Sequence, residues 1–316
     1  MTRFVVCGET LIDLIRASEG PQDAAVSTWS ALSAGGPMNS AVALGRLGMQ
    51  TQFLGRLGSD AFGEQLRSYI DASKVGLDLA VQSSQSTSLA LVSLDTAGLA
   101  TYTFHFADTA NFGWQPEELP SLSADDWLHI ASLSCVVSPG AEILLDWMRT
   151  VRSGVSYDVN VRPTVIGDPT IYWQKVEPWL RVIGGHGGIV RASDEDINFL
   201  PHSRSTSDPI AVAADWVRDY GLNLAVITLG SYGAVAIEAS GRQTRVSGIP
   251  TEVVDTVGAG DTFMAGFLEA RINRELSLEE SLSRGVAAAS IVCSRRGANP
   301  PTAAEVDELV AKVRVG

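Results

Sequence analysis

A glycine-rich turn that leads directly into a helical pattern is the segment best suited to chemistry. It reads DTVGAGDTFMAGF, residues 255–267. Gly258 and Gly260 let backbone N–H groups converge at the start of a helix, where free donors and the helix dipole stabilise an anion. The pattern therefore predicts an anion site at this turn.

Asp261 follows the turn at once. A carboxylate is unfavourable beside a simple phosphate site, but it is useful where a hydroxyl attacks the phosphate and its proton needs an acceptor. The alternative is that Asp261 only caps the helix. A dinucleotide site is excluded, because the third glycine of G-x-G-x-x-G would fall on Phe263.

Two further segments carry paired glycines. In GGPMN, residues 35–39, the glycines bring the backbone close to a ligand, and Asn39 offers a donor and an acceptor for a hydroxyl. The alternative is a tight turn in which Asn39 bonds its own backbone. In TLGSYG, residues 228–233, a buried strand ends in glycines that either expose amides to a nucleotide or form a plain hairpin turn.

Short β-branched segments alternate with longer helical patterns, such as residues 209–221, where Ile210, Ala214 and Val217 share a face and Gly221 ends the helix. This alternation predicts an α/β fold, a Rossmann-like doubly wound and mainly parallel sheet covered by helices on both faces. We expect one domain over residues 1–316. The predicted strands are residues 4–8, 126–132, 155–160, 188–193 and 224–230.

Two stretches break the alternation and are typical of β-structure. The first is LIDLIRA from Leu11, followed by a polar loop up to Leu32. The second has apolar residues at every other position around a turn at residues 95–98, which indicates a hairpin. We expect these insertions, at about 10–33 and 86–110, to pair into a small β-structured lid.

Charge and cysteine content exclude several classes of function. The chain has Lys+Arg 23 and Asp+Glu 36, so its net charge of 23 − 36 = −13 repels nucleic acids and anionic membranes. Cys7, Cys135 and Cys293 are odd in number and far apart, which predicts neither a disulfide framework nor a metal cluster. A reducing cytoplasm is the expected location.

Together, the glycine segments at 35–39, 228–233 and 255–261 resemble those of the ribokinase-like, phosphofructokinase B-type carbohydrate kinases, and look most like fructokinases. The resemblance covers nearly the whole chain. It implies transfer of phosphate from ATP, with Mg²⁺, to a small neutral sugar, and a homodimer through the lid. The alternatives are a 2-keto-3-deoxygluconate kinase, a ribokinase or, in a different class, a noncatalytic sugar-binding regulator on the same fold.

The resemblance also implies roles for single residues. Asp261 would be the general base, and the amides of Gly258, Ala259 and Gly260 would form the anion hole. The implied sugar-binding residues are Asp13, Gly35, Gly36, Asn39, Phe104, Asn160 and Arg162. The implied nucleotide-binding residues are Ser193, Thr228, Gly230, Ser231 and Gly233.

Metal sites follow from the same resemblance. Asp196 would contact Mg²⁺ through water, and Asp255 would bind a monovalent cation such as K⁺. Ser193 stands where ribokinases usually carry asparagine, and Arg191 stands where fructokinases often carry lysine. Pro301 replaces a small hydroxyl residue of ribokinases near the cation, which leaves the potassium requirement open.

The second lid stretch bears on the choice of sugar. Relatives that phosphorylate a sugar acid tend to carry an arginine there, whereas this chain has Ala107 with Asp108 beside it. A carboxylate substrate would lack a charge-assisted partner, so the pattern favours a neutral ketose, and fructose above all. Arg162 leaves the sugar acid open, because it can approach from the other side.

Overall fold

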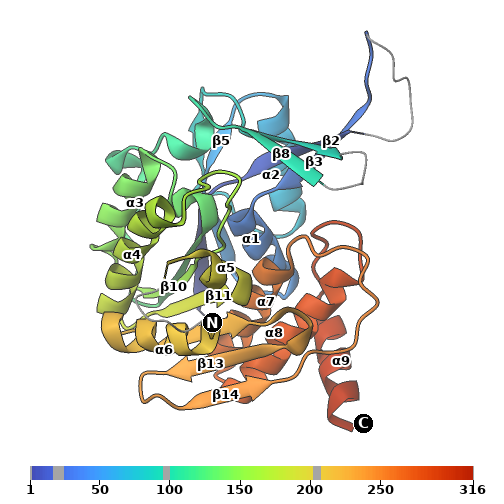
Figure 1. Cartoon of the computed structure of the whole chain (residues 1–316). Coiled ribbons are helices and arrows are strands. Elements are labelled where there is room, and N and C mark those ends of the chain that lie inside the picture. The colour runs from blue at the N-terminus through green and yellow to red at the C-terminus, as the bar shows by residue number, and fades with distance from the viewer. Residues whose placement is uncertain (1, 17–24, 95–99, 202–207, 316) are drawn as a thin grey trace.

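The computed structural model describes residues 2–16, 25–94, 100–201 and 208–315. Within them, the largest sheet has eight strands in the order β14-β13-β12-β11-β10-β9-β1-β4 (Figure 1). Strands β4, β1, β9, β10, β11 and β12 run parallel to one another. Strands β13 and β14 are added antiparallel beside β12. This arrangement confirms the predicted mainly parallel sheet.

The five predicted strands form at their expected places, shifted by at most two residues at an end. Their apolar, β-branched segments are buried on both faces, as a parallel sheet between helices requires. The strands of the main sheet are β1 Arg3–Cys7, β4 Thr51–Leu54, β9 Asp126–Ala131, β10 Gly154–Asp158, β11 Ile189–Ser193, β12 Leu224–Thr228, β13 Ala234–Glu238 and β14 Gln243–Val246.

Helices cover both faces of this sheet and enclose two apolar cores. In β1, Val5 points into one core, while Phe4 and Val6 point into the other, because side chains alternate along a strand. The first core involves α3 Gly140–Met148, α4 Pro169–Gly185, α5 Asp194–Phe199 and α6 Pro209–Tyr220. The second involves α1 Gly36–Arg46, α2 Ala61–Ala72, α7 Ala259–Leu268, α8 Leu278–Cys293 and α9 Ala303–Val315.

Helix α6 illustrates how the sequence sets an element. Gly221 ends it in the left-handed conformation, with φ 74°, as predicted. The predicted face packs against the core, but Ile210 and Ala214 lie at its half-buried margin. The fully buried residues are Val212, Ala213, Trp216 and Val217.

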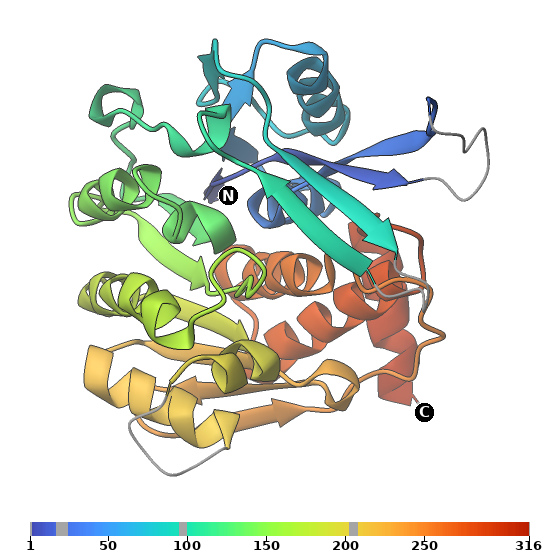
Figure 2. The ribbon, with the colours of Figure 1, turned by 45° about the horizontal axis from the view of Figure 1, so that its top comes forward.

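The two insertions form a separate four-stranded sheet in the order β3-β2-β7-β8, which projects from the body of the molecule (Figures 1 and 2). Its strands are β2 Leu11–Arg16, β3 Trp29–Ala34, β7 Leu89–Leu94 and β8 Ala100–His105. This confirms a small β-structured lid. The expected hairpin joins β7 to antiparallel β8, and its predicted turn at 95–98 lies outside the described residues.

One boundary in the lid was wrong. A polar loop was expected up to Leu32, but strand β3 already begins at Trp29 and pairs antiparallel with β2. Its serines conceal the strand in the sequence, because β3 is an edge strand and its residues alternate between half-buried and exposed. None of the described helices is long and apolar enough to cross a lipid bilayer.

Candidate functional site

Asp261 lies in the first turn of α7 with its carboxyl group buried. Gly258 precedes the helix in the left-handed conformation, with φ 76°. Asn39 from α1 donates its Nδ2 proton to Oδ2 of Asp261 at 2.9 Å, and Nδ2 of Asn160, which follows β10, donates to Oδ1 at 3.2 Å. Three segments that are far apart in sequence therefore meet at one carboxylate.

The environment of Asp261 moves its pKa toward neutral pH. Burial raises its pKa to about 7, against the hydrogen bond from Asn39. Asp158 acts in the same direction as burial, Arg162 and Arg191 act against it, and a pKa of about 7 is the net result. A carboxylate with such a pKa exchanges a proton efficiently near physiological pH.

The paired glycines lie in close contact with the groups around this carboxylate. A Cβ at Gly36 would lie 3.2 Å from Oδ1 of Asp261 and 3.0 Å from Nδ2 of Asn160. Gly35 has φ 125°, and a Cβ there would lie 2.6 Å from the carbonyl oxygen of Glu9. Close approach therefore requires glycine at residue 35, and at residue 36 a side chain would press on Asn160 and Asp261.

The side-chain NH₂ group of Asn39 donates to Asp261 and not to the backbone of its own turn. Its Oδ1 is buried and has no hydrogen-bond partner within the described part of the chain. Buried acceptors are nearly always satisfied, so an orphaned one beside a carboxylate favours a ligand that donates a proton. A hydroxyl is such a ligand.

Backbone strain gathers at the same place. Asn160 and Ser132 are non-glycine residues with φ values of 43° and 60°, and they follow the adjacent strands β10 and β9. Such conformations are costly and cluster at functional sites. These strand ends border the point where the chain order of the sheet changes, between β1 and β9, and crevices at such points bind ligands in doubly wound folds.

The lid carries two further sugar-side candidates on one face. Asp13 and Phe104 are both paired with Ala90 of β7, so their side chains point to the same side of the lid sheet. Tyr102 shares that face and stacks on Phe104, with 6.0 Å between the ring centroids. Burial raises the pKa of Asp13 to about 6, and the charge of Arg162 opposes this.

Arg162 is folded back on its own loop. Its Nη1 donates to the carbonyl oxygens of Val161, at 3.1 Å, and Asn160, at 3.4 Å, and also to Oδ1 of Asn160. Its charge lowers the pKa of both Asp13 and Asp261, so it lies within electrostatic reach of each.

Ser193 and Asp196 bond to one another at the start of α5. Ser193 accepts a hydrogen bond from the amide of Asp196 at 3.0 Å, and Oδ2 of Asp196 accepts one from the amide of Ser193 at 2.7 Å. Oδ1 of Asp196 accepts from the amide of Val161 at 2.8 Å. This capping box explains both residue types, while their nucleotide and metal roles stay predictions.

The nucleotide-side glycines form a tight connection from β12 to antiparallel β13, which is the hairpin alternative. Gly233 has φ 95°, and a Cβ there would lie 2.2 Å from the carbonyl oxygen of Val246. Gly230 and Ser231 lie in the 3₁₀ turn between the strands. Thr228 ends β12, and its hydroxyl accepts a hydrogen bond from Arg191.

Asp255 fastens two loops near the glycine-rich turn. Its Oδ1 accepts from the amide of Val257 at 3.0 Å, and its Oδ2 accepts from the amide of Gly297 at 2.9 Å. The amide of Ala259 donates to the carbonyl oxygen of Thr256 at 3.2 Å and is therefore partly committed to the turn itself.

No group of three or more metal-ligating side chains occurs among the described residues. Both oxygens of Asp196 accept hydrogen bonds from backbone amides, and its water-mediated contact with Mg²⁺ stays a prediction.

The ion pair between Asp158 and Arg191 was missed in the sequence. Asp158 is completely buried, and both of its oxygens accept hydrogen bonds from Nη1 of Arg191. The available signal was an arginine within the apolar strand GIVRAS, residues 188–193. Such a residue requires a buried partner.

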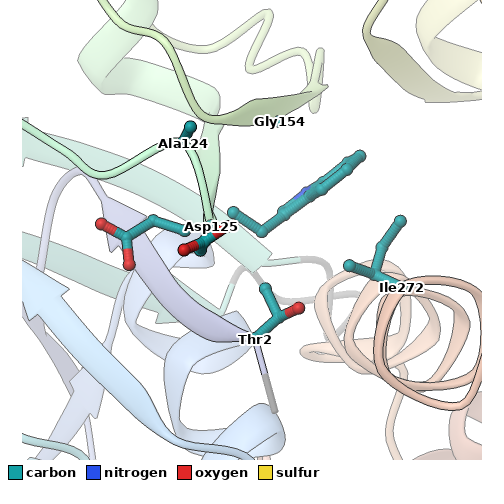
Figure 3. A pocket seen from close by; sticks show the side chains of 7 residues that line it. Thr2, Ala124, Asp125, Gly154 and Ile272 are labelled. Carbon is teal, nitrogen blue, oxygen red and sulfur yellow. The ribbon is translucent and has the colours of Figure 1, made fainter.

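A separate open pocket lies at the amino ends of the strands of the main sheet, on the side away from Asp261 (Figure 3). Thr2, Asp126 and Gly154 line it at the amino ends of β1, β9 and β10. Asp261 and its partners lie at or beyond the carboxyl ends of the same sheet. The pocket is therefore not part of the candidate site.

Comparison with known proteins agrees with this geometry. The sequence pattern of the pfkB family carbohydrate kinases matches residues 1–305. The chain therefore belongs to the pfkB family and is an ATP-dependent carbohydrate kinase, a phosphotransferase with an alcohol group as acceptor.

Fructokinases are prominent among its relatives. A fructokinase of Rhizobium leguminosarum bv. trifolii is 33% identical, over 94% of this chain and 87% of that protein. A fructokinase of Salmonella typhimurium is 30% identical, over 83% of this chain and 82% of that protein.

Solved structures support the same fold. The crystal structure of a fructokinase with bound ATP from Xylella fastidiosa superposes with a TM-score of 0.86, at 24% identity and 99% coverage of both chains. A fructokinase double mutant from Vibrio cholerae O395, in a form with bound fructose, ADP and potassium ion, has a TM-score of 0.80 at 25% identity and 98% coverage of both chains.

Proposed function

We propose that this kinase phosphorylates fructose, with Asp261 as the general base. The observation that carries the proposal is the buried carboxyl group of Asp261, with a pKa of about 7, in the first turn of α7. Amides of Asn39 and Asn160 fix its orientation. A base held in this way acts on a hydroxyl next to an anion-binding helix end.

Each part of the site has a task in this reaction. Gly36 has no side chain that would press on the carboxylate of Asp261, and Oδ1 of Asn39 accepts a hydrogen bond from one of the hydroxyl groups of the sugar. Asp261 takes the proton of the attacking hydroxyl while the amides of the glycine-rich turn, Gly258 to Gly260, stabilise charge on the transferred phosphoryl group. The lid, with Asp13 and Phe104 on one face, closes over the sugar and excludes water.

Residues of the lid region and of the loop after β10 support the preference for a neutral sugar. Nη1 of Arg162 donates its hydrogen bonds within its own loop. The charge of Arg162 also acts on Asp13 and Asp261. We therefore expect it to contribute little to the binding of a substrate carboxylate. Ala107 and Asp108 are exposed and offer no cation on the lid side. Asp13 instead suits sugar hydroxyl groups as an acceptor.

The ions and the location are part of the proposal. Mg²⁺ would neutralise charge on the ATP phosphates, with Asp196 as a water-mediated contact and Ser193, Thr228 and the turn at 230–233 near the nucleotide. For K⁺, the carboxylate of Asp255 is the candidate ligand, although backbone amides already occupy both of its oxygens. We propose a cytoplasmic enzyme, and a homodimer through the lid that light scattering would test.

An assay of ADP release with a panel of sugars tests the function. We expect kcat/KM for fructose to exceed that for 2-keto-3-deoxygluconate by at least about tenfold, which 1.4 kcal/mol represents. A preference for the sugar acid, or for ribose, would assign the chain to another branch of the family. Binding of sugar without any ADP release would indicate a regulator.

A further inference from the structure

Arg191 joins the ends of three neighbouring strands. It lies in β11 and is 6% exposed. Its Nη1 donates to the carboxylate oxygens of Asp158, the last residue of β10, at 3.0 and 3.1 Å. Its Nη2 donates to the hydroxyl of Thr228, the last residue of β12, at 2.6 Å. The guanidinium group is thereby fixed at the carboxyl edge of the sheet.

The same guanidinium group packs against the first turn of α7. A Cβ built on Gly260 would lie 2.6 Å from Nη1, 2.8 Å from Nη2 and 2.9 Å from Cζ of Arg191. No side chain at residue 260 fits unless one of the two groups moves. Gly260 therefore does more than expose its amide: it lets the cation touch the helix one residue before Asp261.

Charges from several elements act on Asp261. Asp158 in β10 raises its pKa, Arg191 in β11 and Arg162 after β10 lower it, and Asn39 in α1 and Asn160 supply neutral donors. Asp158 has no exposed surface, so its charge is not screened by water. Arg191 bonds both oxygens of Asp158, and it therefore stands between the two carboxylates electrostatically.

We propose that Arg191 is a positioning residue for phosphoryl transfer, which seats the start of α7 through Gly260 and screens the carboxylate of Asp261 from that of Asp158. The inference rests on the proposed role of Asp261 as the base. It predicts two separable effects. Loss of screening shifts the pH dependence of the reaction, and loss of seating lowers kcat at every pH.

The variant Arg191→Gln tests the screening. We expect the acid limb of the kcat profile, with its midpoint at about pH 7 in the parent enzyme, to move up by about one pH unit. The ionised fraction of Asp261 at pH 7 would then fall from about one half to about one tenth, a roughly fivefold loss that is recovered by about pH 9. Any loss that persists at pH 9 measures the seating effect. Arg181→Gln, at an exposed ion pair with Glu177, is the control and leaves the profile unchanged.

Two further variants separate electrostatics from packing. Arg191→Lys keeps the charge, so its midpoint should stay near that of the parent enzyme even if kcat falls. Adding Asp158→Asn to Arg191→Gln removes the second charge of the pair and should return the midpoint toward pH 7. A midpoint that stays at the parent value in Arg191→Gln would mean that Arg191 has only a structural role. A midpoint that is raised in Arg191→Gln but does not return when Asp158→Asn is added would mean that Arg191 does not screen Asp158. Either result would overturn the proposal.

A spectroscopic titration covers the case in which the variants are inactive. The side-chain ¹³C resonance of Asp261 reports its protonation directly, without turnover, and thermal unfolding establishes that each variant is folded. An unchanged titration of Asp261 in folded Arg191→Gln would refute the screening. Failure of the proposed function is a different result, namely that the parent enzyme phosphorylates no sugar although the titration of Asp261 still responds to Arg191.

Discussion

The proposed chemistry depends on the side chain of Asp261. Asp261→Asn keeps the size of the group but removes the proton acceptor, so we expect kcat to fall by roughly 10²-fold or more. Sugar affinity should change little, because Asn39 and Gly36 remain. Equilibrium binding of fructose and kcat, measured on the same preparation, check this, and an undiminished kcat would disprove the assignment.

The pH dependence of kcat gives a second test at the same residue. Since burial raises the pKa of Asp261 to about 7, the base is protonated and inactive below that pH. We expect kcat to rise between about pH 6 and pH 8 and then to level off. The residual activity of Asp261→Asn should lack this rise. A midpoint near pH 4 in the parent enzyme would contradict the structure.

Some of this site could be predicted from sequence and some could not. The glycines and Asp261 lie within one short segment, so their spacing alone predicts an anion site and a base. Arg191 shows in the sequence only as a charge within an apolar strand. Its partners, Asp158 and Thr228, come from other strands, and only the register of three strands and the position of α7 identify them.

At the level of elements, one buried side chain joins the two insertions at the base of the lid. Asn111 follows β8 and is 2% exposed. Its Nδ2 donates to the carbonyl oxygen of Thr10 at 2.7 Å and to the hydroxyl of Ser88 at 2.9 Å, and its Oδ1 accepts from the amide of Thr10 at 3.2 Å. Thr10 precedes β2 and Ser88 precedes β7, so Asn111 fixes the bases of both central lid strands.

Removal of this clamp should loosen the lid. Asn111→Ala leaves buried backbone groups unsatisfied, at a cost of about 1–3 kcal/mol. We expect a KM for fructose at least about fivefold higher and more ATP hydrolysed per sugar phosphorylated, because a loose lid admits water. Ser88→Ala, which removes one of the three bonds, should have a smaller effect. Equal hydrolysis in all three proteins would show that the lid does not exclude water.

The lid also marks the limit of pattern analysis for elements. Alternating apolar residues predicted β7 and β8, because half-buried strands have period two. Strand β3 was missed, since it carries two serines among its six residues and its exposed positions, Ser30 and Leu32, do not share one polarity. That the two insertions share one sheet follows from the parallel pairing of β2 with β7, a contact between distant segments that local pattern does not encode.

For the whole molecule, the buried base carries a cost in stability. Asp261 binds its proton up to about pH 7 in the folded protein but only up to about pH 3.8 in the unfolded chain. Folding therefore favours the protonated group, and the free energy of unfolding falls as pH rises from about 4 to about 7 and stays lowered above it. The active, ionised form is the less stable one.

Asp261→Asn should relieve this cost. We expect the variant to be more stable than the parent enzyme by about 1–3 kcal/mol at pH 8, with the difference shrinking toward pH 5. Urea unfolding at both pH values measures it. Equal stability of the two proteins at pH 8 would indicate that the carboxylate is fully compensated by its neighbours.

The contact between Arg191 and Gly260 has a consequence for the evolution of this kinase. Because a methyl group at residue 260 would collide with the guanidinium group, the two positions cannot drift independently. Lineages in which residue 191 has shortened should be the ones that accept alanine at residue 260. In the present chain, Gly260→Ala should be tolerated only after residue 191 has changed. The order of the two mutations therefore decides whether the intermediate protein is functional.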